Sequence, residues 1–391
     1  MALSLGVAVL GMIAVVSSLS QSFMMVSPPL ASAIAPWDGR LAAAYARSFL
    51  KTDTKDAEWR RADKIARKAL VLDPTAVAAV ATLGLAAQKN GNLAAARRDF
   101  AYANRLSRRD IQVQLWSIED AVTRNDVEGA LKFYDIALRT SKNTRDILFP
   151  ILASAIEDEE IRQALVKTFA LGPEWAPHFA SYAAGEGPDP KSTALFFNAL
   201  GRRGLAPSWP HQSTLINRLF YSVSVEAAWS LYEVATPDAR RDGLRDPAFR
   251  SVRGSPSQFD WTPLHDDVIQ ASILAGGDGG VFEYSAPTGV GGPVLQQILL
   301  LPPGKYRLEG RSAGIDQPDD ALPYFQLKCR EGAELGRIAV SRSATMSGDF
   351  SGSVTVPARC PVQSLTLQIR PSDAIAGASG QILRVALRRE G

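Results

Sequence analysis

The sequence contains only three histidines, His178, His211 and His265, which lie far apart along it, and two cysteines. His265, Asp266 and Asp267 bring an imidazole and two carboxylates together, but successive residues of a strand point to opposite faces. We interpret them as a polar turn, with a calcium or structural metal site as the alternative. Asp319 and Asp320 fit a loop better than an acid–base pair, since nothing places a second carboxylate at glycosidase distance. The sequence therefore predicts no catalytic residue, no metal site, no cofactor and no enzymatic activity.

Four aromatic residues of the C-terminal part could bind sugar, because flat rings with a polar end can stack on pyranose faces. These candidate glycan-binding residues are Trp261, Tyr284, Tyr306 and Tyr324. Alternation of apolar and polar residues along a strand would instead place such rings in the core of a sandwich. The core is the favoured interpretation for each ring, and glycan stacking stays open beside it.

Cys329 and Cys360 are the only two cysteines and lie at or near the ends of expected strands. In an oxidising compartment they would close a loop of about 32 residues, which stabilises the fold by roughly 3–4 kcal/mol. Two buried free thiols are the alternative. We predict the disulfide, because the N-terminal segment described below directs the chain out of the cytoplasm.

The strands that would position these residues occupy 257–391, where the hydrophobic period is two. Phe259 and Trp261 alternate with polar residues, as do Phe282 and Tyr284. About eight short strands separated by Gly, Pro and Asp turns predict an antiparallel β-sandwich of jelly-roll type. In layout the domain resembles jelly-roll carbohydrate-binding modules. The further strands are expected at Val294–Leu301, Lys305–Glu309, Tyr324–Cys329, Arg337–Ser341, Phe350–Val356, Ser364–Ile369 and Ile382–Leu387.

The preceding helical part repeats with a period of 34 residues. Small residues recur at two fixed positions in three consecutive windows, and an aromatic residue recurs at a third position. Small side chains allow two helices to approach closely, which explains a glycine inside a helix despite its cost of about 1 kcal/mol. The packing positions are Ala62, Ala69, Pro74, Leu83, Gly84, Ala96, Phe100, Ala103, Ala130, Tyr134 and Ala137.

This pattern resembles the tetratricopeptide repeat, a helical hairpin that stacks with its neighbours into an α-solenoid. The resemblance is clear over 43–76, 77–110 and 111–144, and degenerate over 145–235. Gly91 would end one helix and Asn92 would cap the next; Asn125 and Asp126 repeat that chemistry one period later. The alternative is an Ala-rich helical bundle without repeats. The resemblance implies a concave face that binds a protein partner.

The solenoid is expected to span 37–236, and later helices fit Glu174–Ala184, Pro190–Arg203 and Gln212–Glu233, the last with a break near Val223. Turn-forming residues then predict a linker at 237–256. The expected fold class is thus multidomain α + β, comprising an N-terminal membrane helix, a tetratricopeptide-like solenoid and a C-terminal sandwich.

The N-terminal segment 1–36 contains no charged residue, and Ala2–Val26 is long enough to span a bilayer as a helix. We favour an uncleaved single-span anchor. The alternative is a signal peptide cleaved after the small residues of Ala31–Ala33. Either places the bulk of the chain in the periplasm, with an inner-membrane tether in the first case and release into the periplasm in the second.

Composition also limits the classes of function that fit this sequence. A net charge of +3 over 391 residues gives no general argument for nucleic acid, and 46% hydrophobic residues indicate globular domains. The expected function is a non-enzymatic envelope scaffold, whose solenoid binds a protein and whose sandwich binds a glycan or a second protein. The overall order resembles bacterial envelope proteins linked to surface polysaccharide production or export. The alternatives are a polysaccharide-processing enzyme with a carbohydrate-binding domain, and a self-associating structural protein.

Overall fold

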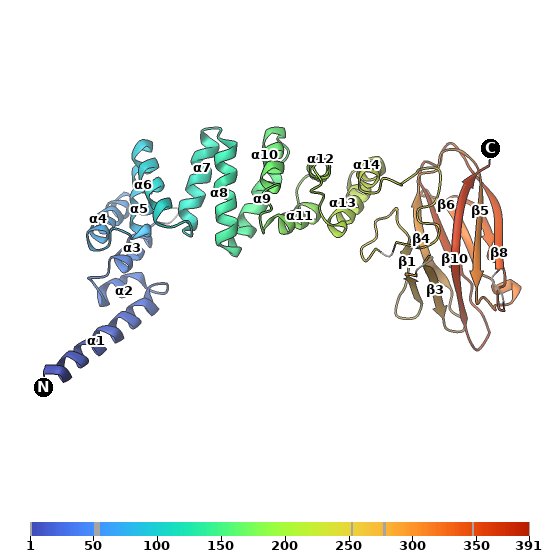
Figure 1. Cartoon of the computed structure of the whole chain (residues 1–391), viewed down its shortest axis with the longest axis horizontal. Coiled ribbons are helices and arrows are strands. Elements are labelled where there is room, and N and C mark those ends of the chain that lie inside the picture. Colours follow the sequence, from blue (N-terminus) through green and yellow to red (C-terminus); the bar gives the residue numbers. More distant parts are fainter. Residues whose placement is uncertain (1, 51–54, 252, 277–278, 346–347, 391) are drawn as a thin grey trace. The chain divides into compact units, whose positions relative to one another are not determined.

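The computed structural model describes residues 2–50, 55–251, 253–276, 279–345 and 348–390, with the side chains of residues 2–10 outside that description. The chain forms two compact units, residues 1–176 and 177–391. The first unit is helical. The second combines four helical segments with two β-sheets, so the architecture is α + β (Figure 1).

The first unit consists of consecutive helices joined by short turns. Helix α5 packs on α6, α7 on α8, and α3 on both α4 and α5. This arrangement fits an α-solenoid, in which each helix pair buries its apolar face against its neighbours. The elements are α1 (Ala2–Phe23), α2 (Pro28–Ile34), α3 (Gly39–Arg47), α4 (Asp56–Leu72), α5 (Val77–Lys89), α6 (Leu93–Leu106), α7 (Ile111–Thr123), α8 (Val127–Thr140), η1 (Lys142–Thr144), α9 (Arg145–Ala155) and α10 (Glu159–Phe169).

The small residues predicted at the helix crossings are buried. Ala62, Ala69, Ala96 and Ala103 have no exposed surface, and Ala130 and Ala137 are nearly as deeply buried. A Cβ on Gly84 would lie 2.7 Å from the ring of Phe100, so this position of α5 has no room for a larger side chain. Phe100 in turn stacks on Trp116 with ring centroids 4.0 Å apart.

The predicted turn chemistry is also present. Gly91 adopts φ +75° and Asn125 adopts φ 59°, the left-handed conformation that ends a helix. The side chain of Asn92 accepts a hydrogen bond from the amide of Ala95 at 3.0 Å, and that of Asp126 accepts one from Gly129 at 2.8 Å. Both side chains therefore cap the helices that follow them. Pro74 lies exposed just after α4, and its carbonyl accepts from the hydroxyl of Tyr102.

The N-terminal segment begins with α1, which ends at Phe23, and continues into the short α2. Over the described part of the chain, no helix combines the length and the apolar character that a membrane crossing requires. The predicted span Ala2–Val26 includes residues 2–10, whose side chains lie outside the described residues.

The second unit opens with helices that pack on one another: α12 contacts α13 and α14, and α13 packs on α14. The predicted break at Val223 is present, since α13 ends before it and Ser224 caps α14 through a hydrogen bond from the amide of Ala227. The bounds are α11 (Ala176–Gly185), α12 (Pro190–Gly201), α13 (Trp209–Ser222) and α14 (Val225–Ala235).

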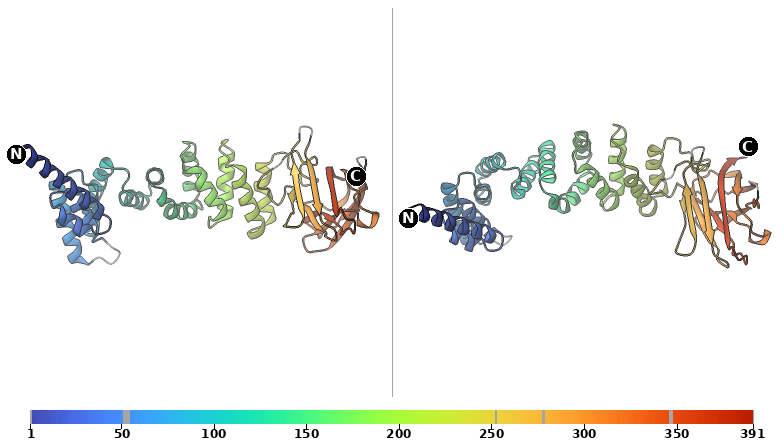
Figure 2. Two further views of the ribbon diagram at one scale, coloured as in Figure 1. Left: turned by 90° about the horizontal axis from the view of Figure 1, so that it is seen from below. Right: turned by 60° about the horizontal axis from the view of Figure 1, so that its bottom comes forward.

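Two five-stranded sheets complete the second unit as a sandwich (Figures 1 and 2). Sheet A has the strand order β1-β4-β9-β6-β7 and sheet B the order β2-β3-β10-β5-β8, with antiparallel pairing throughout the described ladders. The strands are β1 (Thr262–Pro263), β2 (Gln270–Leu274), β3 (Val281–Ala286), β4 (Gly292–Leu299), β5 (Gly304–Ala313), β6 (Tyr324–Cys329), β7 (Glu334–Ala339), β8 (Gly348–Val356), β9 (Gln363–Ile369) and β10 (Ala378–Arg389), with a 3-10 turn η2 (Asp319–Ala321) before β6.

Between the sheets lies one apolar core built from alternate residues of the strands, as period-two patterning requires. Cys329 at the end of β6 is bonded to Cys360 just before β9, with their Cα atoms 5.5 Å apart. The predicted disulfide is therefore confirmed. Because β6 and β9 are neighbours in sheet A, the bond joins two adjacent strands at the same end.

The segment 237–256, predicted as a linker, is packed. Arg245 donates to the hydroxyl of Tyr232 on α14 at 2.8 Å, and its backbone amide donates to the side chain of Gln297 on β4 at 2.9 Å. Arg253 lies 3.7 Å from the centroid of the Trp209 ring on α13. Arginine side chains of this segment thus contact α13 and α14, and its backbone contacts the sandwich, which composition alone does not reveal.

Candidate functional site

Three of the four aromatic residues proposed for sugar stacking are buried. Trp261 is 6% exposed, Tyr284 4% and Tyr306 0%, and all three belong to the sandwich core. The indole of Trp261 donates to the carbonyl of Asp246, and the hydroxyl of Tyr306 donates to that of Pro302. This placement corrects the glycan-stacking interpretation for these rings and agrees with the core alternative, because period-two alternation turned them inward.

Tyr324 is the exception, since it lies half-buried on the outer side of sheet A. The guanidinium groups of Arg337 and Arg370 each lie 5.0 Å from its ring centroid. Cation–π contacts of this kind engage the ring inside the protein. Tyr324 is therefore a poor platform for a sugar.

The acidic segment that begins at His265 forms a turn. The carboxylate of Asp266 accepts from the amides of Val268 at 2.8 Å and Ile269 at 2.6 Å. The hydrogen bond from Ile269 is the main reason why the pKa of Asp266 lies below its usual value. Within the described residues, no three His, Cys, Asp or Glu side chains converge as a metal site would require.

A hollow of about 640 Å³ lies instead on the outer face of sheet B, over strands β2, β3 and β10. Tyr284 and Gly380 belong to its lining, and they pair directly across β3 and β10. A Cβ on Gly380 would lie 2.7 Å from the Tyr284 hydroxyl, so glycine allows the two strands and this ring to meet. Burial raises the pKa of Tyr284, which keeps the ring neutral beneath the hollow.

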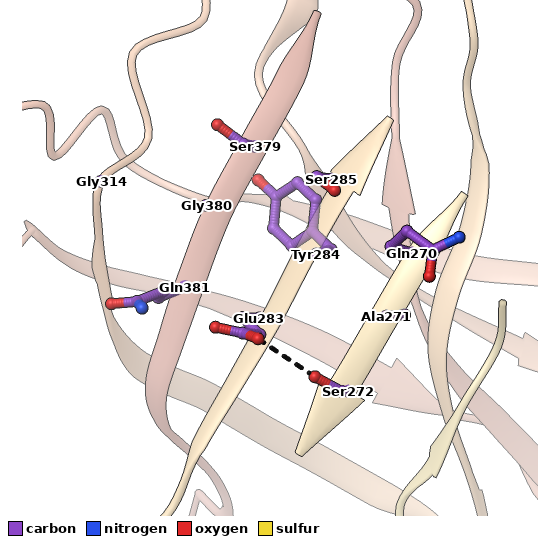
Figure 3. A pocket seen from close by; sticks show the side chains of 10 residues that line it. All are labelled: Gln270, Ala271, Ser272, Glu283, Tyr284, Ser285, Gly314, Ser379, Gly380 and Gln381. Atoms are coloured by element: carbon purple, nitrogen blue, oxygen red, sulfur yellow. Dashed lines mark hydrogen bonds between the residues drawn. The ribbon is translucent and has the colours of Figure 1, made fainter. Parts of the chain in front are cut away.

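Six polar side chains form two rows across these strands, and we call them the polar grid. Strand pairing places residues directly opposite one another on the same face of the sheet. One row contains Gln381, Glu283 and Ser272, and the other Ser379, Ser285 and Gln270. Figure 3 shows the six side chains on their three strands around the hollow.

Spacing within the polar grid follows from sheet geometry. Neighbouring strands lie about 4.8 Å apart, and successive outward residues of one strand roughly 7 Å apart. Glu283 accepts a hydrogen bond from Ser272 at 3.2 Å, the dashed line of Figure 3. The side-chain amide of Gln317 donates to the carbonyl of Ser379 at 2.7 Å, which holds the beginning of β10 beside the grid.

The polar grid offers both donors and acceptors of hydrogen bonds. Amides offer both functions, hydroxyls offer both, and an ionised carboxylate offers strong acceptors. Such a surface is suited to a ligand that itself carries many hydroxyl groups. Among the described lining residues Glu283 is the sole carboxylate, which makes it the strongest acceptor of the polar grid. Hydrogen bonding to such a ligand is the chemistry that these side chains offer.

The sequence did not identify the polar grid. Its members are common surface residue types on three strands, and the first and the last, Gln270 and Gln381, lie more than a hundred positions apart. The one sequence signal is alternation: on β3 the polar residues alternate with Phe282, Tyr284 and Ala286, which face the core, and therefore point outward. This alternation locates the polar grid only when the pairing of β10 with β3 is also known.

No family model and no curated protein matches this chain. Among solved structures, the chain is similar to TmCBM61 in complex with β-1,4-galactotriose at 17% identity, with a TM-score of 0.28 over 39% of this chain and all of that one (100%). It is also similar to a structure described as "CBM4 structure and function" at 11% identity and a TM-score of 0.29, covering 38% of this chain and 99% of that one.

A third similarity is to the enzymatically active domain of bacteriophage CBA120 tailspike protein 4, at 11% identity and a TM-score of 0.27. The match covers 34% of this chain and spans only 20% of the tailspike chain.

Proposed function

We propose that this chain is a non-enzymatic glycan-binding protein whose polar grid contacts the hydroxyl groups of a polysaccharide. The observation that carries the proposal is the hollow over β2, β3 and β10, lined by outward amides, hydroxyls and one carboxylate. These side chains sit on a disulfide-bonded sandwich, and sites on strands hold their geometry better than sites on loops.

Binding in this proposal depends on hydrogen bonds, because the aromatic rings considered for stacking lie in the core or are engaged by arginines. Each hydrogen bond contributes modestly, about 0.5–1.5 kcal/mol, or about 1.5–3 kcal/mol where one partner is charged. Glu283 is accordingly the residue of the polar grid whose loss weakens binding most.

The helical first unit has a separate role in the proposal. Stacked helix pairs of the tetratricopeptide type offer a continuous surface for a protein partner. We place the protein in the periplasm, tethered to the inner membrane by its uncharged N-terminal segment. The Cys329–Cys360 bond supports this compartment, since disulfides persist where the environment is oxidising.

A binding panel tests the proposal. Full-length protein is titrated calorimetrically with neutral galactan, xylan and laminarin and with acidic polygalacturonate and alginate. We expect saturable binding to at least one of them, and replacing Glu283 with Ala should weaken it about ten- to a hundredfold. Gln381→Ala should have a smaller effect in the same direction.

Gln368→Ala is the matched control, since Gln368 lies on the outer side of sheet A and Gln381 on that of sheet B. Its affinity should equal that of the wild type. Absence of binding across the panel, or equal losses for Gln368→Ala and Gln381→Ala, would contradict the proposal.

A further inference from the structure

The outer face of sheet B continues beyond the polar grid onto strands β10, β5 and β8, where its character becomes charged. Three rows cross these strands: Arg384, Arg311 and Asp349; Ala386, Glu309 and Ser351; Arg388, Arg307 and Ser353. Arginine therefore stands directly opposite arginine twice, at Arg384–Arg311 and at Arg388–Arg307.

Like charges directly opposite one another destabilise a sheet. Asp349 offsets the first pair through a 2.9 Å contact with Arg311, and Glu309 offsets the second through a 3.5 Å contact with Arg388. Within the described part of the chain, Arg384 has no acidic partner, and the same holds for Arg250, whose loop borders the same face. Charge compensation on this face is therefore incomplete at Arg384, and departures from such local rules are expected at functional sites.

A hollow of about 920 Å³ lies over these rows, and we call it the charged groove. Its lining includes four arginines, Arg250, Arg307, Arg311 and Arg384, against two carboxylates, Glu309 and Asp349. Strand β10 lines both hollows, the polar one at 379–381 and the charged one at 383–384. The two hollows therefore adjoin along β10, whose outer face from Ser379 to Arg388 is roughly 30 Å long at the rise of a β-strand.

We propose that the charged groove binds the carboxylates of an acidic polysaccharide, so that the glycan recognised by this protein contains uronic acid residues. This inference rests on the proposed function and narrows its ligand class. Arginine binds carboxylates in a planar, two-pronged geometry, and Arg384 is free to do so. The hydroxyl groups of the same polymer then contact the polar grid on the adjoining part of β10.

A polysaccharide fits this surface better than a nucleic acid. Proteins that bind single strands stack bases on exposed aromatic rings. Phe350 is the aromatic side chain among the described residues lining the charged groove, and it is 5% exposed.

Polygalacturonate and neutral galactan test the inference with full-length protein and an Arg384→Gln variant. We expect polygalacturonate to bind more tightly than galactan, and Arg384→Gln to weaken polygalacturonate binding about ten- to a hundredfold while leaving galactan unchanged. Binding of polygalacturonate should also fall between about 0.01 M and about 1 M ionic strength, where the screening length shortens from about 30 Å to about 3 Å.

Arg359→Gln is the matched control, because Arg359 is exposed in the turn between β8 and β9 and lies outside the charged groove. Thermal melting of both variants checks that they remain folded. Equal affinity for the two polymers, or wild-type polygalacturonate binding by Arg384→Gln, would overturn the inference. If galactan still binds and depends on Glu283, the proposed function survives that result; if no polymer binds, both fail. The inference would also be overturned if single-stranded DNA bound as tightly as polygalacturonate.

Discussion

Replacing Phe259 with Ala is expected to lower the free energy of unfolding of residues 177–391 by about 3–5 kcal/mol. Phe259 is fully buried and lies between helices and sandwich. Its ring centroid is 5.1 Å from those of Trp229 and Tyr232 on α14 and 6.0 Å from that of Phe220 on α13. Truncation leaves a cavity at the centre of this aromatic cluster, and neighbouring rings can fill it only in part.

Urea denaturation followed by tryptophan fluorescence measures the effect, since Trp229 borders the cavity. Tyr221→Ala is the control: Tyr221 also contacts Phe220 but is 67% exposed, so its loss should cost less than about 1 kcal/mol. A loss below about 1 kcal/mol for Phe259→Ala would mean that the helices and the sandwich are energetically separate.

The expected large loss has a practical consequence for fragments of this protein. A fragment that contains the sandwich should begin near residue 177, so that it retains α12, α13 and α14.

Removal of the Cys329–Cys360 bond is the second change expected to lower the free energy of unfolding strongly. Replacing both cysteines with Ala should lower the free energy of unfolding by about 3–4 kcal/mol, because the bond closes a loop with a sequence separation of 31 residues. Differential scanning calorimetry with and without a reducing agent measures it. The wild type should lose stability on reduction and the double variant should not change. Equal melting of the two oxidised proteins would contradict the account.

Helix positions were predictable because their signals are local. Gly91, Asn92, Asn125 and Asp126 define turns through their own backbone conformation and capping bonds, without help from distant residues. The spacing of alanines likewise reports which side of each helix meets its neighbour. Chemistry encoded within four or five positions can thus be found by inspection of the sequence.

Strands were predictable where one face is fully buried. Tyr324–Cys329 coincides with β6, whereas β2 was missed because this edge strand has no fully buried residue. Phe259 and Trp261 alternate as a strand would, yet lie before β1 and pack in the junction and the core. Packing against Trp229 and Tyr232 of α14, rather than pairing with a strand, decides the place of Phe259.

The candidate site was not predictable for a further reason. The glutamate and glutamine that meet in the polar grid, Glu283 and Gln381, are brought together only by the register of β3 and β10. Likewise, the sequence does not show that Arg384 and Arg311 are cross-strand neighbours until β10 is aligned with β5. Aromatic residues drew attention in the sequence because of their chemistry, but their hydrophobic rings stabilise the core.

Footprinting of the full-length protein, free and saturated with polysaccharide, tests the central claim most directly. A diffusible carbene labels exposed side chains, and mass spectrometry locates those that the ligand protects; polygalacturonate and neutral galactan are used in parallel. We predict protection confined to the outer face of sheet B, centred on β2, β3 and β10. Protection on β4, β9 and β6 of sheet A, or on the helices alone, would contradict the assignment of this face as the binding site.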